Sequence, residues 1–436
     1  MINIADFWET KEKYDLVVIG AGPSGIGASV AAARRGMRVA LVESYGFAGG
    51  VATQSCCPIF YGFAVDGKQT TGGISDEFVR RMDRRGAASL CIGNTNTPDF
   101  EKIGEKTLNK KVSFDGETMK LEYNKMLLES GVDCIFYTQL TDVLVENGSI
   151  KAVLLSGFEG TYFLEADSFI DSTGNAQLSF LAAPDSVNIC PSELGMHSSM
   201  FFILDGVKDF DIDEAKKIYS EDYKAGRLPR LVWEHFGTAK LLKKGSYQIA
   251  VCFEIGDGAN SREMTRMDMS MRECVFEVVE YLKNRIKGFE DCSLSSTSVK
   301  VGVRTSRNII SACDLTEERL FSDEYYHPVA LCRRSYGMHS NKQGGMASAF
   351  AKNVGGIGAV PMETLVSAKF DNFLAAGRCI GSSPELVGAF RMMNTCMTTG
   401  EAAGLMAFSA KQNGKKVSEV QYSELLPLLK ENNFIL

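Results

Sequence analysis

A strand, a glycine-rich turn and a helix near the start of the chain constrain its fold more than any other feature. Residues 14–19 form a short apolar run, rich in β-branched side chains, that ends at Gly20. Such a run is typical of a parallel strand covered on both faces. A helical pattern over residues 23–35 and a second apolar run over 37–43 follow. This strand–helix–strand unit predicts an α/β fold with a Rossmann-like parallel sheet.

The turn after the first strand has the spacing Gly-x-Gly-x-x-Gly of a dinucleotide-binding loop. We expect Gly20 to permit the tight turn, Gly22 to let a pyrophosphate approach main-chain N–H groups, and Gly25 to let helix and strand pack closely. Glu43 ends the second strand, where a carboxylate accepts hydrogen bonds from ribose hydroxyls. A glycine-rich turn without a ligand is the weaker interpretation, because the flanking strands, helix and acid are all present. The predicted contacts in this region are Gly20, Ala21, Gly22, Pro23, Ser24, Gly25, Glu43 and Ser44.

A glycine doublet, Gly49-Gly50, follows Glu43 and precedes Val51-Ala52-Thr53. At this point the sequence resembles the glutathione-reductase-like flavoproteins with two dinucleotide-binding folds, in which this order of motifs accompanies FAD rather than NAD. Residues 169–175 are similar to a strand of that family that ends in Thr-Gly, and residues 374–378 to a late strand that ends at the ribityl chain.

Three later segments give a more specific resemblance. Residues 301–307, 377–380 and 391–404 look like those of the family of predicted FAD-dependent oxidoreductases, so the resemblance reaches over essentially the whole chain. It implies FAD as the cofactor and does not identify a substrate. The further cofactor contacts that it implies are Gly49, Gly50, Val51, Ala52, Thr53, Thr173, Gly174, Gly377, Arg378, Arg391, Met392, Asn394 and Thr395.

A stripe of small residues is predicted on a helix over residues 393–411. Gly400, Ala403, Gly404 and Ala407 fall at i, i+3, i+4 and i+7, which places them on one smooth face. Either the backbone of another helix or a flat ring can lie against such a face. Because the helix begins near Asn394, its first amides could also face the pyrimidine edge of a flavin and stabilise negative charge there.

Catalytic candidates are few, because the chain has only 4 histidines. His339 precedes the late flavin strand and could act as a general base in a substrate wall, although a surface or structural histidine is the alternative. Arg304 and Arg307 are three residues apart and could hold a substrate carboxylate or neutralise a reduced flavin. Structural ion pairs are the alternative for both arginines.

The cysteines and the charge balance exclude several classes of protein. The 12 cysteines contain no Cys-x-x-Cys pair, which argues against zinc ribbons and iron–sulfur motifs, so we expect no metal. We expect the cysteines to be reduced thiols in a cytoplasmic protein. Adjacent Cys56 and Cys57 would need a strained ring to form a disulfide, so we expect two ordinary thiols. The net charge of −7 disfavours a nucleic-acid partner. Glycines interrupt the uncharged residues 16–33, which argues against a membrane span.

The strand–helix–strand pattern of the first part of the chain changes near residue 191 and returns after 297. We therefore predict a discontinuous FAD-binding domain over 1–190 and 298–436, interrupted by an α+β substrate domain over 191–297. The predicted function is an FAD-dependent oxidoreductase that moves hydride between a small polar organic substrate and flavin N5. A double-bond reductase, a monooxygenase or a non-redox binding module on the same fold are the alternatives. The sequence does not identify the electron acceptor, and it does not decide whether the protein forms a homo-oligomer.

Overall fold

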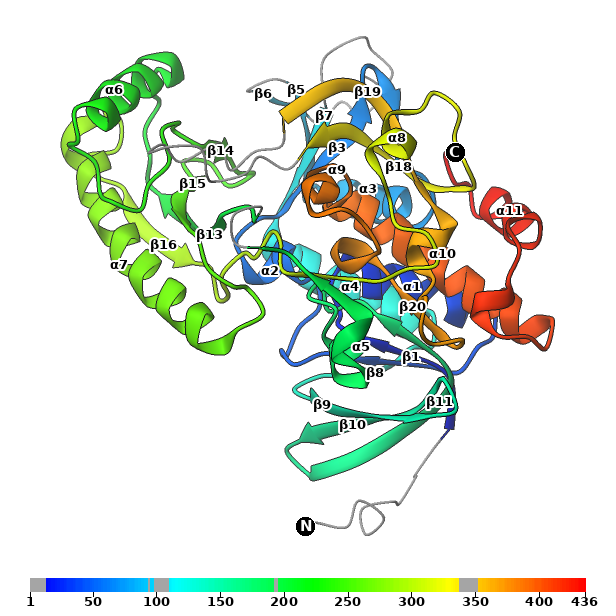
Figure 1. Ribbon diagram of the computed structural model, residues 1–436. Helices are drawn as coiled ribbons and strands as arrows, with labels where there is room; N and C mark the ends of the chain where they lie inside the picture. Colours follow the sequence, from blue (N-terminus) through cyan, green and yellow to red (C-terminus); the bar gives the residue numbers. More distant parts are fainter. Residues whose placement is uncertain (1–12, 93–94, 98–109, 192–194, 337–351) are drawn as a thin grey trace.

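The computed structural model describes residues 13–92, 95–97, 110–191, 195–336 and 352–436 (Figure 1). Its central sheet has 7 strands in the order β8-β2-β1-β11-β10-β9, with β20 also paired to β11. Strands β8, β2, β1, β11 and β20 run parallel, so their carboxyl ends meet at one edge. The strands are β1 (Lys13–Ile19), β2 (Val39–Val42), β8 (Asp133–Ile135), β9 (Gln139–Glu146), β10 (Ser149–Gly157), β11 (Gly160–Asp171) and β20 (Phe373–Ala375). The predicted Rossmann-like α/β class is confirmed.

The other strands form two larger sheets and two antiparallel pairs. A five-stranded sheet has the order β4-β3-β7-β5-β6, formed by β3 (Ile59–Val65), β4 (Lys68–Gln69), β5 (Ala88–Ile92), β6 (Thr95–Thr97) and β7 (Lys110–Phe114). A four-stranded sheet has the order β14-β15-β13-β16, formed by β13 (Ser198–Asp205), β14 (Thr238–Lys240), β15 (Tyr247–Glu254) and β16 (Ser293–Thr297). The pairs are β12 (Val187–Ile189) with β17 (Arg307–Ile309), and β18 (Pro328–Tyr336) with β19 (Lys352–Pro361). The sequence analysis predicted neither the five-stranded sheet nor the β18–β19 pair.

The helices divide between the central part and the four-stranded sheet. Helices α6 (Ile212–Lys224) and α7 (Ser261–Arg285) cover the four-stranded sheet, and Figure 1 shows this layer to one side of the rest. The other helices are α1 (Pro23–Arg34), α2 (Val51–Gln54), α3 (Gly73–Arg84), α4 (Gly116–Glu129), α5 (Gln177–Ala182), α8 (Glu317–Phe321), α9 (Val387–Phe390), α10 (Met393–Gln412) and α11 (Tyr422–Glu431). Short 3₁₀ helices span Pro184–Ser186, Met362–Leu365, Gly377–Cys379, Pro384–Leu386 and Val417–Glu419. Among the described residues, no helix combines the length and apolar composition that a membrane crossing requires.

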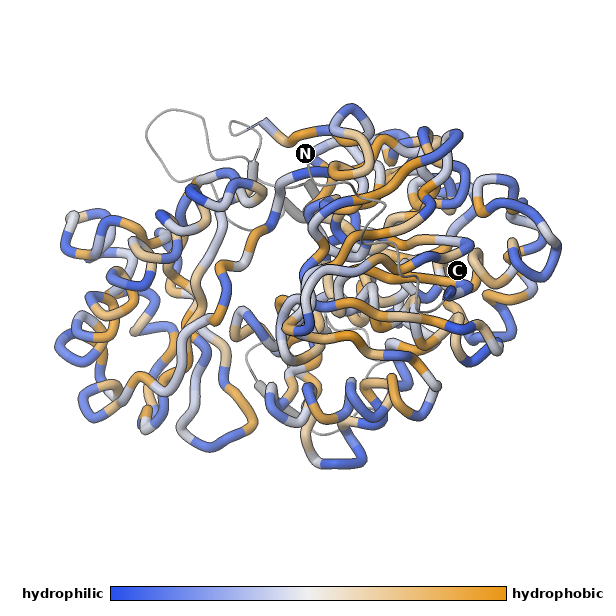
Figure 2. Tube along the Cα trace, turned by 90° about the horizontal axis from the view of Figure 1, so that it is seen from below, coloured by the Kyte–Doolittle hydropathy of each residue, from blue (hydrophilic) through white to orange (hydrophobic). Residues whose placement is uncertain are grey.

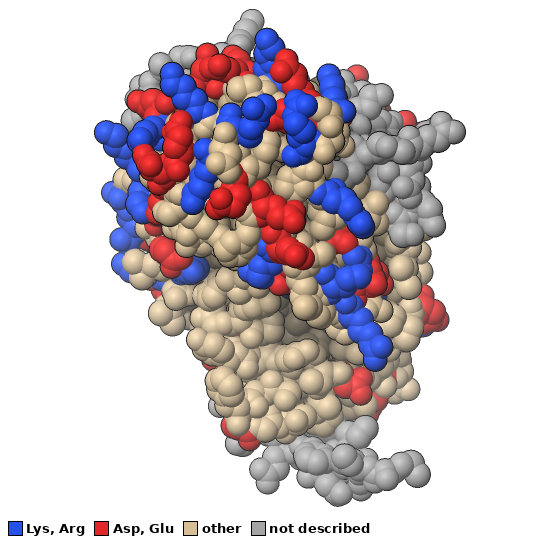
Figure 3. Space-filling view, turned by 90° about the vertical axis from the view of Figure 1, so that its left-hand side faces the viewer, with Lys and Arg blue, Asp and Glu red and all other residues tan. Residues whose placement is uncertain are grey.

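The four-stranded layer has a hydrophobic core of its own, formed by buried residues between Met200 and Val301. In Figure 2 the hydrophobic segments gather in the interior of each part, while the outward turns are hydrophilic. Figure 3 shows basic and acidic side chains interspersed over the side formed by α6 and α7, without a continuous basic stripe on that face. This layer lies within the predicted substrate domain, and the domain boundaries themselves stay a prediction.

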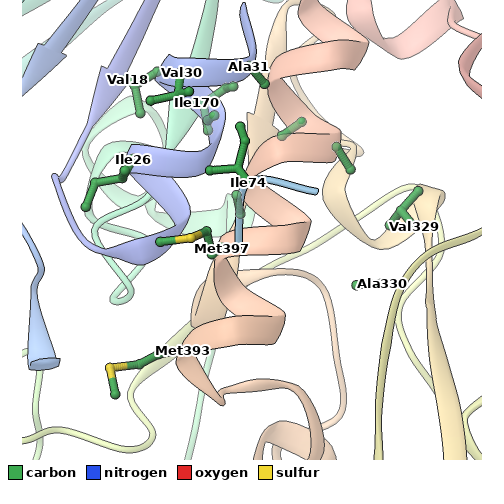
Figure 4. Close-up of a cluster of buried hydrophobic side chains, with 14 of the residues drawn as sticks. Val18, Ile26, Val30, Ala31, Ile74, Ile170, Val329, Ala330, Met393 and Met397 are labelled. Atoms are coloured by element: carbon green, nitrogen blue, oxygen red, sulfur yellow. The ribbon is translucent and has the colours of Figure 1, made fainter. Parts of the chain in front are cut away.

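Helices α1 and α10 pack backbone to backbone, although they are more than 350 residues apart in the chain. A Cβ added at Gly400 would overlap the carbonyl oxygen of Ser24, and one added at Gly404 would overlap that of Ala28. Because both contacts advance by four residues in the same direction, the two helices run parallel. Figure 4 shows Met397 of α10 lying against α1 in the surrounding hydrophobic core. The small-residue stripe is therefore occupied by another helix, which leaves only the start of α10 available to a ring.

A methyl group at Gly400 tests this packing. Because the added carbon has no space beside Ser24, we expect Gly400→Ala to lower the free energy of unfolding by about 1–3 kcal/mol. Gly116→Ala is the matched control, since a Cβ there meets only the Cβ of Pro58 at 3.9 Å. Urea unfolding followed by circular dichroism measures both variants. Equal stability of the two would show that α1 and α10 do not pack this closely.

Candidate functional site

A cavity of about 700 Å3 opens at the carboxyl ends of the parallel strands. Ligands in open α/β sheets bind at this edge, and the volume lies in the range of small-molecule and cofactor sites. Fourteen of the residues predicted to contact the cofactor line it: Gly20, Gly22, Pro23, Ser24, Glu43, Ser44, Gly50, Val51, Thr173, Gly174, Arg378, Arg391, Met392 and Thr395. The structure thus brings together motifs from the two ends and the middle of the chain.

The remaining predicted contacts lie behind this lining: Ala21, Gly25, Gly49, Ala52, Thr53, Gly377 and Asn394. Several hold the lining residues in place. The Ala21 N–H donates to Glu43 Oε2 at 2.8 Å, and Asn394 Nδ2 donates to the carbonyl of Gly62, which also lines the cavity, at 3.4 Å. Any part that these residues play in cofactor binding therefore passes through the neighbours that they position.

The turn between β1 and α1 fits a pyrophosphate. Gly22 is the N-cap of α1, and no side chain caps the helix there, so the first N–H groups have no intrahelical or side-chain partner. A Cβ on Gly22 would meet nothing within 4 Å, because this position faces the open cavity. By contrast, a Cβ on Gly25 would overlap the carbonyl oxygen of Gly20, and Gly20 itself has φ +99°. Gly20 thus serves the turn and Gly25 the packing expected from the sequence, and the open space at Gly22 fits the ligand approach that we predict there.

Glu43 lies at the end of β2 with 7% of its surface exposed. Its carboxylate accepts the N–H of Ala21 at 2.8 Å and the N–H of Tyr45 at 3.0 Å, which fixes the side chain at the cavity wall. Lys300, which the sequence analysis did not single out, also lines the cavity. Burial lowers the pKa of Lys300, and the negative charge of Glu43 partly opposes this. A carboxylate and an ammonium group therefore both line the cavity, and the charge of Glu43 acts on Lys300.

The start of α10 forms another part of the wall. Met392 is its N-cap, no side chain caps this helix of 20 residues, and Met393, Thr395 and Cys396 line the cavity. The uncapped N–H groups and the helix dipole make this end favourable to negative charge. The residues of this helix start therefore fit the electron-accepting edge of a flavin.

Buried arginines supply most of the remaining charge. Arg304 donates through Nη1 to the carbonyl of His197 and lies over the ring of Phe253 at 4.8 Å. Burial, together with the charge of Arg391, lowers the pKa of Arg304 to about 9. Arg378 donates to Ser306 Oγ at 3.2 Å and to Asn175 Oδ1, and burial lowers its pKa to about 10. Both guanidinium groups stay protonated near neutral pH and carry a strong desolvation penalty.

The charge on the cavity wall is unbalanced. Within the described ranges of the chain, the lining residues include one carboxylate, Glu43, and five cations: Lys300, Arg304, Arg333, Arg378 and Arg391. The Nε atoms of Arg333 and Arg391 are buried without a hydrogen-bond partner there. Arg333 belongs to no motif that can be recognised in the sequence. It lies in strand β18, which the sequence analysis did not predict. Such a wall fits a ligand that brings its own negative charge.

One predicted catalytic residue, Arg307, does not join this wall. Arg307 is absent from the lining; its guanidinium lies over the ring of Phe180 at 3.8 Å and donates to Gln177 Oε1 at 3.2 Å. It is therefore placed for structural packing, and we do not carry it into the proposal below. His339 lies outside the described residues.

The thiols near the cavity are not activated. Cys57 lines the cavity, and burial raises its pKa to about 11; burial also raises the pKa of Cys56. Thiolates, not thiols, are the reactive species in disulfide exchange. Both residues are free cysteines. This favours the interpretation of Cys56 and Cys57 as ordinary thiols.

Comparison with known proteins gives a match along almost the whole chain. The model of a family described as "FAD dependent oxidoreductase" matches residues 15–429. A tRNA uridine 5-carboxymethylaminomethyl modification enzyme of Flavobacterium johnsoniae is 28% identical over 150 residues, which are 33% of this chain and 22% of that protein. The aerobic glycerol-3-phosphate dehydrogenase of Bacillus subtilis is 26% identical over 215 residues, 38% of this chain and 39% of that protein. The chain thus spans well under half the length of these two relatives.

Among solved structures, a geranylgeranyl bacteriochlorophyll reductase-like protein of Thermoplasma acidophilum aligns with a TM-score of 0.49 at 12% identity. The alignment covers 96% of this chain and 84% of that one.

A valine at Gly22 tests the role of the α1 turn. The backbone there is extended, with φ −71° and ψ 179°, and a Cβ has free space, so we expect Gly22→Val to fold. Its branched side chain would fill the space in front of the first N–H groups of α1, and the Kd for FAD should rise by roughly a hundredfold, about 2.7 kcal/mol.

Gly25→Val is the matched comparison, because its side chain would overlap the Gly20 carbonyl and should destabilise the apoprotein. Titration with FAD and urea unfolding of the apoproteins separate the two effects. Undiminished FAD binding by a well-folded Gly22→Val protein would contradict this assignment of the turn.

Proposed function

The chain belongs to the family of FAD-dependent oxidoreductases, and we propose that it is a dehydrogenase that transfers hydride between a small polar organic substrate and N5 of the flavin. FAD, when bound, supplies the centre that accepts or donates hydride, and the protein supplies orientation and charge. The proposal assigns the pyrophosphate to the α1 turn, the ribose to Glu43, and the pyrimidine end of the ring to the start of α10.

One observation carries the proposal: a single cavity joins the cofactor turn to the four-stranded layer. Ser199 and Phe201 of β13 and Ala250 of β15 line the same cavity as Gly22 and Met392. We propose that this layer, within residues 191–297, forms the substrate wall opposite the flavin. A substrate held there would be shielded from water on the side of the flavin, which prevents loss of reducing equivalents to solvent.

Arg391 and the start of α10 would stabilise the charge that develops as hydride reaches the flavin. Both lie on one wall of the cavity, and the helix start has no side-chain cap to compete for its N–H groups. Donors that are fixed before the reaction stabilise developing charge without reorganisation. The proton released by an alcohol or amine substrate needs an acceptor, and His339 stays our prediction for that role.

The reductase and monooxygenase alternatives need NAD(P)H to reduce the flavin, and this chain offers little to bind it. Its second glycine cluster, residues 355–358, lies within β19 and not between a strand and a helix. A second Gly-x-Gly-x-x-Gly turn between a strand and a helix therefore has no counterpart in the described part of the chain. A tRNA substrate, as in one relative's name, is disfavoured by the net charge of −7 and by the mixed charges in Figure 3.

Anaerobic reduction of the FAD-loaded protein tests the proposal. We expect one class among small alcohols, amines and hydroxy acids to bleach the oxidised flavin spectrum, while NADH and NADPH reduce it much more slowly. Stopped-flow absorbance with each compound measures these rates, and heat release of the cofactor confirms FAD content beforehand. Rapid reduction by NADH or NADPH, with none by any organic substrate, would favour a reductase or monooxygenase instead.

A further inference from the structure

We infer that the substrate is a small organic anion, and that Arg304 and Arg391 hold its anionic oxygens against the flavin side of the cavity. The inference rests on the proposed function and narrows its substrate class. The chemistry of the site does not separate a carboxylate from a phosphate group, since guanidinium groups bind both through paired N–H donors.

Arg304 is held in place by the four-stranded layer and not by the turn between β1 and α1. Its Nη1 donates to the carbonyl of His197, and its guanidinium lies 5.9 Å from the ring centre of Phe201 and 4.8 Å from that of Phe253. The two rings belong to β13 and β15, and Ser199 of β13 forms a bridge with Gly302, two residues before Arg304. The four-stranded layer therefore fixes the position of Arg304.

Most of the hydrogen-bonding capacity of Arg304 is unused. A guanidinium carries five N–H donors, and the described residues give this one a single hydrogen bond. Only 7% of the residue's surface is exposed, and none of its nitrogen atoms is both fully buried and unpartnered, so the free donors have open space beside them. Since the residue also lines the cavity, the free donors have a ligand as their natural partner.

Arg391 lies on the part of the cavity wall at the start of α10. It follows α9 and directly precedes Met392, the N-cap of α10. Its Nε is buried without a hydrogen-bond partner, and no salt bridge joins it to any acid in the described ranges. Its positive charge contributes to the lowered pKa of Arg304, so the two cations repel each other across a shared space.

No other group in the described cavity wall neutralises this pair. Glu43 is the one lining carboxylate there, and its oxygens accept the N–H groups of Ala21 and Tyr45. The charge of Glu43 acts on Lys300 instead. The pyrophosphate of FAD is assigned to the α1 turn. An anionic group on the substrate would therefore relieve the repulsion between Arg304 and Arg391. It would also connect the four-stranded layer to the start of α10.

Binding to the oxidised, FAD-loaded protein tests this inference without turnover. Matched probes are propionate against propionamide, and glycerol 3-phosphate against glycerol. We expect one of the two anions to perturb the flavin absorption spectrum and its neutral partner to have no effect. The anion that binds distinguishes a carboxylate from a phosphate. A shift of the flavin spectrum without bleaching reports binding alone. This result therefore does not depend on whether any compound reduces the flavin, and the proposed hydride transfer can fail while the binding inference holds.

Variants assign the binding to the two arginines. Arg304→Lys should raise the Kd of the bound anion by about tenfold or more, while FAD content stays at the wild-type level. Arg391→Gln should raise that Kd likewise, and because we also place Arg391 beside the flavin, its Kd is measured on protein reloaded with excess FAD. Arg230→Gln, which removes an exposed arginine of the same layer, should leave the Kd unchanged. Circular dichroism verifies that each variant is folded.

Two results would overturn the inference. One is that neither anion perturbs the flavin or protects the protein thermally, or that the neutral partners bind equally well. The other is that Arg391→Gln shifts the flavin reduction potential or loses FAD while anion affinity is unchanged, which would assign this arginine to the cofactor alone.

Discussion

The contact between α1 and α10 is the interaction on which the site depends. The glycines at positions 27, 400 and 404 let two helix backbones touch, and because the helices run parallel, both of their uncapped N-termini face the same end of the molecule. Each helix start contributes free N–H groups and the positive end of a dipole. A bulkier side chain at this contact would separate the two ends of the chain, and with them the two halves of the cofactor site.

The second constraint is electrostatic. Five cationic side chains and one carboxylate line the described cavity, and burial lowers the pKa of Arg304 to about 9 and of Arg378 to about 10. Burying so many like charges costs free energy unless a ligand compensates. FAD brings a pyrophosphate, and the inferred substrate brings a second anionic group. Ligand binding should therefore stabilise the folded protein substantially, as expected when a ligand binds only the native state.

Local motifs made much of this predictable from the sequence. Gly20, Gly22 and Gly25 each require a distinct backbone environment, so their spacing after an apolar run predicts both the turn and its ligand. The stripe at Gly400 and Gly404 predicts a close approach but cannot say what approaches. Lys300 and Arg333 join the cavity only through the packing of distant segments, and no local pattern marks them. Arg307, three residues from Arg304, starts strand β17, and its guanidinium lies over Phe180 instead of in the cavity.

A crystal structure of the FAD complex tests the central claim most directly. The account predicts the pyrophosphate against the main-chain N–H groups that begin α1 at Gly22, a ribose hydroxyl on Glu43, and the pyrimidine edge of the flavin at the start of α10 beside Arg391. A flavin bound away from the start of α10, or a pyrophosphate that does not contact the α1 turn, would contradict the claim that these two helix starts together build the cofactor site.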